Sequence, residues 1–133
     1  MGAIRLDTTK WPLAVFTCDG KQTDDDVTSF LGELEKLLSR AQPYLVMMEV
    51  RSYDANFGHI KRIGLWTKER FETSKKHLAA TALVVDSEAF RMLLATFFLV
   101  VKMPVPFTCV TSRKEADAWL RAQAVKAGLK LPD

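Results

Sequence analysis

The sequence lacks a hydrophobic segment long enough to cross a membrane. Its longest apolar run, Leu93 to Val101, is interrupted by Thr96 and ends at Lys102, whereas a membrane-spanning helix needs about 20 predominantly apolar residues. The first residues, Met-Gly-Ala-Ile-Arg-Leu-Asp, also lack the charged and then apolar profile of a secretory signal. We therefore predict no integral membrane segment and a cytoplasmic location.

Cysteine is scarce. The chain has two cysteines, Cys18 and Cys109, each near the end of a predicted strand. No Cys-x-x-Cys pair is present, and a zinc site would need further ligands at matching spacing. Buried free thiols are favoured over a disulfide, because a bridge would require adjacent strands and an oxidising compartment. No metal site is expected.

The motifs of common enzyme classes are also missing. There is no Gly-x-Ser-x-Gly and no glycine-rich phosphate loop. His59 follows Gly58 in the first turn of a predicted helix, and it would act as a base only if Ser52 or Cys18 came within reach and a third group oriented it. We interpret His59 as a polar surface residue, and we predict no catalytic residue, no cofactor and no enzymatic activity.

What the sequence does contain is an ordinary globular composition. It has 133 residues, of which 48% are hydrophobic and 26% charged, with a net charge of +3. These values predict a single domain over residues 1–133. The basic residues of the middle helix are interleaved with acids and apolar residues, which is typical of a solvated helix face and predicts no nucleic-acid partner. They are Lys61, Arg62, Lys68, Arg70, Lys75 and Lys76.

Short apolar runs alternate with longer stretches of helical periodicity. The order β-β-α-β-α-β-α-β-α predicts an α/β fold with a mostly parallel sheet of about five strands and about four helices packed on it. The predicted strands are 4–7, 12–18, 44–50, 79–86 and 107–111. The predicted helices open at Thr23 and stop at Pro43, run roughly from 55 to 75, from 87 to about 103, and from 112 to Gly128.

Two of these helices begin with recognisable capping residues. Thr23 is a candidate N-cap, and the acidic residues 24–26 that follow it suit the positive end of the helix dipole. We interpret these three aspartates as a helix start and not as a metal cluster, because consecutive helical positions point in different directions. Ser112 and Glu115 have the spacing of a capping box.

The strand 44–50 is nearly all apolar, so we expect it to be covered on both faces and central in the sheet. A polar bend follows it and leads into a helix, which is where open α/β sheets usually place their working residues. Asp54 or Ser52 can cap that helix. We identify the bend as a candidate interaction loop, consisting of Arg51, Ser52, Tyr53, Asp54, Asn56 and His59.

The helix from 87 to about 103 is apolar nearly all round, although packing on one sheet needs a stripe little wider than 100°. Its second face could be covered by a neighbouring helix, by another subunit of a homodimer, or by an apolar ligand or lipid surface. Leu65 and Trp66 also lie off the inward stripe of the preceding helix. The candidate residues for an apolar pocket or dimer face are Phe57, Leu65, Trp66, Met92 and Phe97. Gly64, inside that helix, is explained by close helix-to-sheet packing.

Several segments together resemble a known family. They are the strand Trp-Pro-Leu-Ala-Val-Phe, the strand Pro-Tyr-Leu-Val-Met-Met-Glu-Val, the helical segment Arg62–Trp66, and Pro-Val-Pro-Phe followed by Glu115–Leu120. Over nearly its whole length the chain resembles a STAS-type domain, the fold of bacterial anti-sigma-factor antagonists. It is most similar to the small stand-alone SpoIIAA-like branch, which is grouped with the CRAL-TRIO lipid-transfer fold.

This resemblance implies a non-enzymatic regulatory or protein-interaction module. Antagonist-type STAS domains are phosphorylated at a serine or threonine within an Asp-Ser-(Ser/Thr)-x-x-Gly-like motif that starts the helix after the central strand. Here residues 51–58 read Arg-Ser-Tyr-Asp-Ala-Asn-Phe-Gly, so the motif is broken and Ser52 is the remaining candidate for phosphorylation. The alternative function is binding of a small apolar or lipid ligand between the second and third predicted helices.

Overall fold

The computed structural model describes residues 4–51 and 57–132, with the side chain of Phe57 excepted. Its elements alternate as the sequence predicts. The strands are β1 (Ile4–Lys10), β2 (Leu13–Cys18), β3 (Tyr44–Val50), β4 (Leu78–Val85) and β5 (Phe107–Val110). The helices are α1 (Asp24–Ser39), α2 (Phe57–Glu69), α3 (Phe71–His77), α4 (Glu88–Val100) and α5 (Arg113–Ala127).

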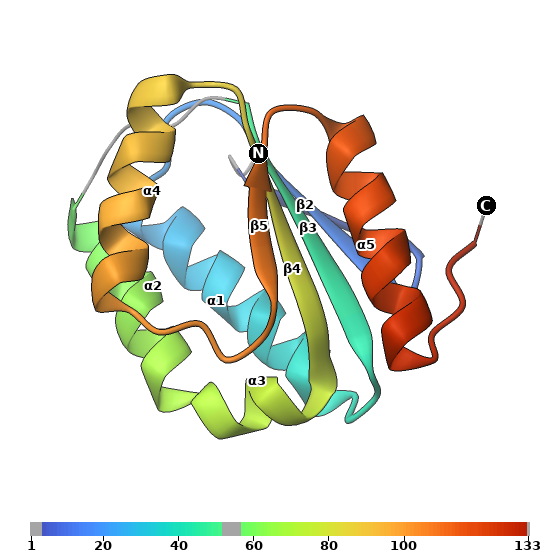
Figure 1. Cartoon of the computed structure of the whole chain (residues 1–133). Helices are drawn as coiled ribbons and strands as arrows, with labels where there is room; N and C mark the ends of the chain where they lie inside the picture. Colours follow the sequence, from blue (N-terminus) through green and yellow to red (C-terminus); the bar gives the residue numbers. More distant parts are fainter. Residues whose placement is uncertain (1–3, 52–56, 133) are drawn as a thin grey trace.

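The five strands form one sheet in the order β1-β2-β3-β4-β5. β1 pairs with β2 antiparallel, and the remaining neighbours pair in parallel. Because every crossover from β2 onward moves the same way along the sheet, right-handed connections place α1 to α4 on one face. Figure 1 shows α5 alone on the opposite face. The mostly parallel α/β sheet predicted from the sequence is confirmed.

The central strand β3 is covered on both sides, as its apolar sequence predicts. Tyr44 and Val46 belong to the core beneath α1, together with Phe16 of β2. Leu45 and Met47 belong to the core beneath α5. Alternate residues of a strand point to opposite faces of the sheet, so one apolar run supplies both cores.

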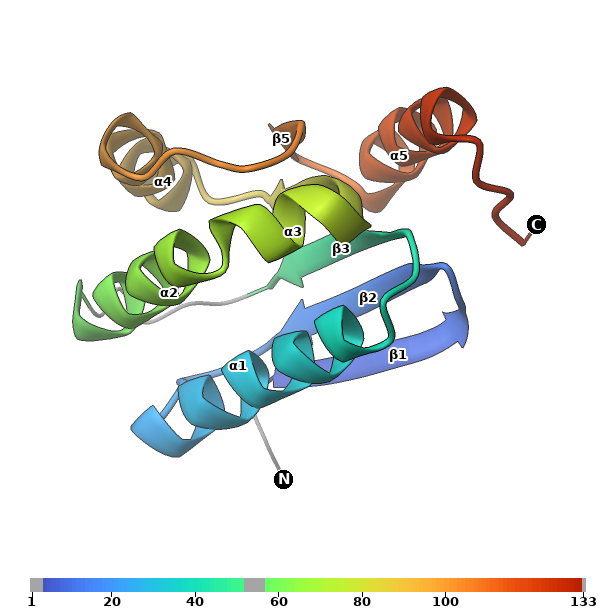
Figure 2. The same cartoon turned by 90° about the horizontal axis from the view of Figure 1, so that it is seen from below.

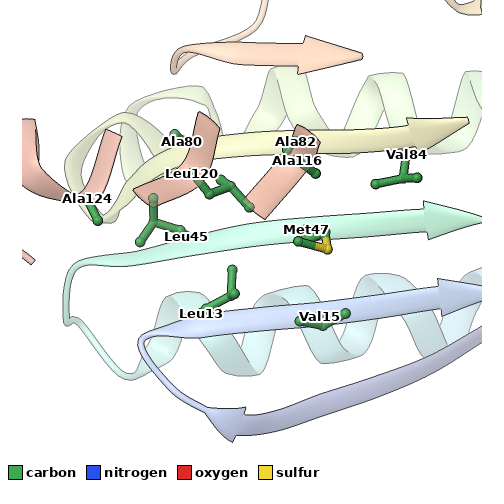
Figure 3. Close-up of a cluster of buried hydrophobic side chains, with 10 residues drawn as sticks. All are labelled: Leu13, Val15, Leu45, Met47, Ala80, Ala82, Val84, Ala116, Leu120 and Ala124. Atoms are coloured by element: carbon green, nitrogen blue, oxygen red, sulfur yellow. The ribbon is translucent and has the colours of Figure 1, made fainter. Parts of the chain in front are cut away.

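The α5 face of the sheet is closely packed (Figure 3). Leu120 projects from α5 onto the sheet between Ala116 and Ala124, and all three are buried. Alanine at two of the three contact positions allows the helix backbone to lie close to the strands. The strand residues beneath them are Leu13, Val15, Leu45, Met47, Ala80, Ala82 and Val84.

The N-caps predicted at Thr23 and Ser112 are present, with a full capping box at Thr23 and only the serine half of one at Ser112. Thr23 Oγ1 accepts a hydrogen bond from the backbone N–H of Asp26, and the Asp26 carboxylate accepts one from the N–H of Thr23. Ser112 Oγ accepts from the N–H of Glu115, while the Glu115 carboxylate accepts from the hydroxyls of Thr111 and Ser112. The interpretation of the aspartates as a helix start is confirmed for Asp26.

The predicted helix from 55 to 75 is in fact two helices. α2 ends at Glu69 and α3 begins at Phe71, with Arg70 between them at φ −107° and ψ 23°. The guanidinium of Arg70 forms ion pairs with Glu35 of α1 and with Glu69. Figure 2 shows α2 and α3 end to end between α1 and α4. α3 ends at His77 and leads directly into β4. The break at Arg70 therefore falls in a segment whose sequence has helical periodicity throughout, and i→i−4 backbone bonds continue across it.

Two other boundaries differ from the prediction. β1 extends to Lys10 across an irregularity in register after Asp7. α4 ends at Val100, before the predicted position near 103, and Val101 is already extended. Pro104 disfavours helical backbone at the residue before it, so the helix stops within the turn that precedes this proline. In the described part of the chain, no helix has both the length and the apolar character needed to span a bilayer.

Candidate functional site

The helix α4 lies on the sheet far less tightly than α5. None of its residues is buried. Phe90 and Leu94 are partly buried against the ends of β2, β3 and β4. Its most exposed apolar side chains are Met92, Leu99 and Val100, which are 67%, 87% and 83% exposed; Val100 also borders the groove between α2–α3 and α4. The sequence predicts apolar surface all round this helix, and much of that surface is exposed to solvent. The described residues of α2 and α3 cover one side of it.

A groove of about 780 Å³ runs between α2–α3 and α4. Its walls are almost entirely apolar, with Leu65 and Phe71 on one side and Leu93 and Phe97 on the other. Three exposed lysines and Thr96 supply its polar groups, and none of the lining residues that the structure describes is acidic. The remaining lining residues are Ile60, Lys61, Gly64, Lys68, Val100, Val101 and Lys102.

Gly64 of α2 lies close to side chains of α4 and of the residue that follows it. A Cβ atom placed on Gly64 would lie 3.2 Å from Cε2 of Phe97 and 3.3 Å from Cγ2 of Val101. These are tight contacts with one side chain of α4 and with that of Val101, which follows it. The sequence interpretation that Gly64 permits close helix-to-sheet packing is therefore wrong: the glycine permits close helix-to-helix packing along the groove.

A second, inner cavity of about 160 Å³ lies beneath α4, against the carboxyl ends of the strands. Its wall is formed by apolar side chains of the sheet and of α1, α2 and α4. They include Cys18, Met48, Leu83, Phe90, Leu94, Phe97 and Phe98. Four polar residues also line it: Gln22, His59, Thr67 and Thr81. Ile60 and Phe97 line both the inner cavity and the outer groove, so they separate the two spaces.

His59 is a buried residue, in contrast to the surface position inferred from the sequence. Its exposed fraction is 3%, and its Nε2 atom lies 2.9 Å from Oδ1 of Asp24 at the start of α1. The neighbouring Arg62 donates to the Asp24 carbonyl at 3.1 Å and to Thr28 Oγ1 at 2.8 Å. Together these contacts connect the first turn of α1 to the first half of α2.

The sequence contains a signal for this helix pair. Asp24 and Thr28 are four residues apart on α1, and His59 and Arg62 are three apart on α2, so each polar pair lies on one side of its helix. The stripe continues to Trp66, whose Nε1 donates to Glu35 Oε1 at 3.0 Å. The tertiary structure decides that the polar side of α1 faces the polar side of α2.

The residues proposed for an apolar pocket or dimer face fall in different places. Leu65 and Phe97 line the outer groove. Met92 lies on the outward side of α4. Trp66 packs toward α1, with the Arg70 guanidinium 5.5 Å from its ring centroid, and so lies outside the groove. Phe57 is the first residue of α2, and its side chain lies outside the described residues.

The proposed interaction loop is described only at its two ends. Arg51 is exposed, and its Nε donates to Glu49 Oε1 at 3.3 Å. His59 is buried between α1 and α2 and does not form part of an exposed loop. Ser52, Tyr53, Asp54 and Asn56 lie outside the described residues, as does the proposed cap of α2 at Ser52 or Asp54.

Both cysteines are free thiols, and β3 and β4 separate their strands. Burial at the inner cavity raises the pKa of Cys18 to about 12. Burial also raises the pKa of Cys109, partly offset by the positive charge of Arg91. Thiols in this environment are protonated at neutral pH and react slowly. Among the described residues, no three His, Cys, Asp or Glu side chains are placed so that they could hold a metal ion together.

Comparison with known proteins assigns the fold to a family. The model of the family described as SpoIIAA-like matches residues 13–121. This chain belongs to the SpoIIAA-like family. The resemblance stated from the sequence is confirmed.

A solved structure supports the same assignment. The chain is similar to an uncharacterized protein of the DUF3478 family with a SpoIIAA-like fold from Shewanella loihica PV-4, with a TM-score of 0.56 and 18% identity. The similarity covers 89% of this chain and 92% of that one. At this level of identity the likeness shows the fold alone. No curated protein matches this SpoIIAA-like chain.

Proposed function

We propose that this SpoIIAA-like domain binds an amphiphile with an apolar chain and an anionic headgroup in the groove between α2–α3 and α4. The observation that carries this proposal is the groove itself, an apolar channel beside a helix that buries none of its residues. Ligand pockets typically measure about 300–1,000 Å³ and have mostly apolar walls, and this groove lies within that range.

The apolar wall favours a hydrocarbon chain. Burying one methylene group contributes roughly 0.8 kcal/mol, so a chain lying between Leu65 and Leu93 gains binding energy with each carbon that it buries. Phe71 and Phe97 add ring surface at the two sides of the groove. A short polar ligand would leave these side chains in water and gain little.

The charges at the groove favour an anionic headgroup. Lys61 and Lys68 project from α2, and Lys102 follows α4 with its ammonium 5.8 Å from the ring centroid of Phe71. An acidic headgroup next to these ammonium groups would be attracted by several positive charges at once. Because the lysines are exposed, salt would weaken this attraction.

Palmitate binding measured by calorimetry tests the proposal, together with mass spectrometry of lipids that co-purify with the protein. We expect palmitate to bind and the triple variant Lys61→Glu, Lys68→Glu, Lys102→Glu to bind it at least tenfold more weakly. The control Lys114→Glu, Lys126→Glu, Lys130→Glu makes the same charge change on the other face of the sheet. Equal losses in both variants, or no binding by the native chain, would contradict the proposal.

Blocking the groove provides a test that does not depend on charge. Thr96 is an exposed residue of α4 at the groove wall, so Thr96→Trp adds volume there without disturbing the core. This variant should keep its stability and lose palmitate binding. Retained binding would place the ligand elsewhere.

A second candidate is the regulatory or protein-interaction module that the STAS resemblance implies. The outward apolar side of α4, with Met92 and Leu99, favours it, because large exposed apolar patches commonly mark interaction surfaces. Light scattering after size exclusion tests the homodimer form of this proposal, with Leu99→Asp as the disrupting variant. A monomeric native chain at all concentrations would exclude the homodimer.

Phosphorylation of Ser52 belongs to the same candidate and remains a prediction. Incubation with cell lysate and ATP, followed by mass spectrometry, should find stoichiometric phosphate on Ser52 and none in Ser52→Ala. Both candidate functions are non-enzymatic, and we propose a cytoplasmic location for both. The contact between His59 and Asp24 supports a structural role for this histidine, because it connects α1 to α2.

A further inference from the structure

The sheet face that carries α5 has a groove of its own beside that helix. α5 packs mainly on β3, β4 and β5, so β1 and β2 lie beside the helix on this face. Figure 3 shows Leu13 and Val15 of β2 here, with β1 beyond them. The groove measures about 330 Å³, and Leu13, Val15 and Met47 form its floor. Its walls are Lys10, at the end of β1, and three residues of α5: Arg113, Lys114 and Asp117.

The groove carries an excess of positive charge. Three of its lining side chains are cationic and exposed, and Asp117 is the one acidic residue among the described residues that line it. The Asp117 carboxylate is already engaged, because Nε of Arg121 donates to its Oδ2 at 2.8 Å. Lys10 and Lys114 form no ion pair with any residue that the structure describes. The described part of the chain therefore leaves these cations largely uncompensated.

The cations of the two walls act on the same carboxylate. Asp7 lies on β1, and hydrogen bonds from Thr9 are the main cause that lowers its pKa. The positive charges of Lys10 and Arg113 lower the pKa of Asp7 further. Both side chains thus reach the strip of sheet between β1 and α5, where they favour a negatively charged group.

The first residues of α5 oppose the dipole of their own helix. Negative side chains are favoured at the N-terminus of a helix and positive ones at its C-terminus. α1 follows this rule with three aspartates in its first turn, whereas α5 begins with Arg113 and Lys114 and only then reaches Glu115. Departures from such local preferences are expected at functional positions. The groove gives these two cations a role that the stability of α5 does not.

We propose that this basic groove docks an extended acidic segment of a partner protein. Successive side chains of an extended chain point to opposite sides. One acidic side chain can therefore approach Lys10 while its neighbour approaches Arg113 and Lys114 on the α5 side. The surface lies across the sheet from the groove between α2–α3 and α4, so it does not depend on the proposed binding of an amphiphile there.

The lining of the basic groove favours a peptide over a nucleic acid. Grooves that bind single-stranded nucleic acids combine positive charge with aromatic side chains on which the bases stack. None of the described residues that line this groove is aromatic. The carboxylate of Asp117 at its wall would repel a phosphate, whereas a carboxylate can accept a hydrogen bond from a peptide N–H.

Fluorescence anisotropy with labelled octa-glutamate tests the proposal. The native chain should bind this peptide, and the variant Lys10→Glu, Arg113→Glu, Lys114→Glu should bind it about tenfold more weakly, because three attractive charges become repulsive. Glutamate at the start of α5 suits the helix dipole, so we expect this variant to fold.

The matched control is the variant Lys61→Glu, Lys68→Glu, Lys102→Glu. It makes the same change in net charge on the other face of the sheet. At an ionic strength of about 0.1 M the Debye length is about 10 Å, so distant charges contribute little. The control should therefore bind octa-glutamate nearly as tightly as the native chain does.

Backbone amide signals in NMR spectra of the native chain locate the peptide without any variant. Octa-glutamate should shift the amide signals of Lys10, Val15 and Lys114. It should leave those of Lys68 and Phe97, on the other face of the sheet, unchanged. This measurement remains valid if the triple variant of the basic groove folds poorly.

Three results would overturn the proposal. The first is the absence of shifts at Lys10, Val15 and Lys114 with millimolar octa-glutamate. The second is an equal loss of affinity in the two triple variants. The third is tighter binding of an oligothymidylate of the same length than of octa-glutamate, which would identify a nucleic acid as the partner of this surface.

Discussion

The helices α4 and α5 cover opposite faces of one sheet in very different ways. α5 buries Ala116, Leu120 and Ala124 against the strands, although its average composition is polar. α4 is the most apolar helix of the chain by mean hydropathy of its residues, yet it buries none of them. Apolar content therefore does not measure how firmly a helix is held. How firmly a helix is held on the sheet depends instead on the spacing of small and large residues on its contacting side.

This difference separates the scaffold from the candidate site. Regions with few buried contacts are those that open locally at low free energy, and ligand-binding elements are commonly drawn from them. Both the outer groove and the inner cavity are bounded by α4, and neither involves α5. We therefore expect substitutions of buried residues on α5 to act on stability and substitutions on α4 to act on amphiphile binding.

The largest expected difference in the free energy of unfolding is between substitutions of two leucines, one on α5 and one on α4. Leu120→Ala should lower the free energy of unfolding by about 2–5 kcal/mol, because it creates a cavity in the core beneath α5. Leu99→Ala on the outside of α4 should change it by less than about 0.5 kcal/mol. Urea unfolding of both variants measures the contrast. Similar losses would show that α4 is covered by something in solution, such as a second copy of the chain.

Enlarging an alanine tests the same contrast in the other direction. Ala116→Leu should destabilise the protein by about 1–3 kcal/mol, because the space between α5 and the strands is already filled. Ala95→Leu on the exposed side of α4 should be nearly neutral. Thermal melts of the pair check this prediction. A neutral Ala116→Leu would mean that α5 is as loosely held as α4.

Alkaline pH tests how well the α1–α4 layer excludes water. Burial raises the pKa of Cys18 and of Tyr44 to about 12. In the unfolded chain these groups ionise near about 8.5 and about 10. Stability should therefore be full below pH 8.5 and fall as pH rises toward 12, by about 1.4 kcal/mol per pH unit for each titrating group.

Urea unfolding between pH 8 and pH 11 measures this loss, and the variants Cys18→Ala and Tyr44→Phe separate the two contributions. Each variant should show a shallower fall than the native chain over the range in which its own group titrates. If α4 admits water freely, Cys18→Ala will follow the native curve while Tyr44→Phe remains shallower. That result would show that the layer is closed over Tyr44 alone.

The smallest effects concern how helices end. α5 ends at Gly128, which has a left-handed backbone with φ 72°, whereas α4 passes directly into extended backbone at Val101. Gly128→Ala should cost about 1 kcal/mol, because an L-residue is strained in that conformation. After α1, Ala41 already occupies a left-handed position with φ 52°. Ala41→Gly should therefore stabilise the protein by a few tenths of a kcal/mol to about 1 kcal/mol.

Differential scanning calorimetry can resolve both changes. The two substitutions are reciprocal, so their shifts in melting temperature should have opposite signs. A lower melting temperature for Ala41→Gly would show that the flexibility of glycine in the unfolded chain outweighs the strain that it relieves.

Much of the fold was predictable because its signals are local. The capping residues Thr23 and Ser112 lie within one turn of the groups that they bind, and the apolar run of β3 matches its two-sided burial. The break at Arg70 was not predictable, because it coincides with ion pairs to Glu35 of another helix and to Glu69. Local patterns do not contain the partners of long-range contacts.

The candidate site was predicted only in outline. The excess apolar surface of α4 indicated a second covering, and Leu65 and Phe97 do lie on one groove. Trp66 was grouped with them because it leaves the inward stripe, but its indole meets Glu35 on α1. The position of Gln22 at the inner cavity gave no signal at all, because a single polar residue before a helix is typically solvent-exposed.

The order of the strands and helices, their caps and the two-sided burial of β3 were determined by the sequence itself, because each depends on residues within a few positions of one another. The tertiary structure alone decided that His59 meets Asp24, that Gly64 faces Phe97 and that Gln22 borders a cavity. These arrangements join residues more than 30 positions apart. Their geometry is set by how the helices pack across the sheet, which no local pattern of residues encodes.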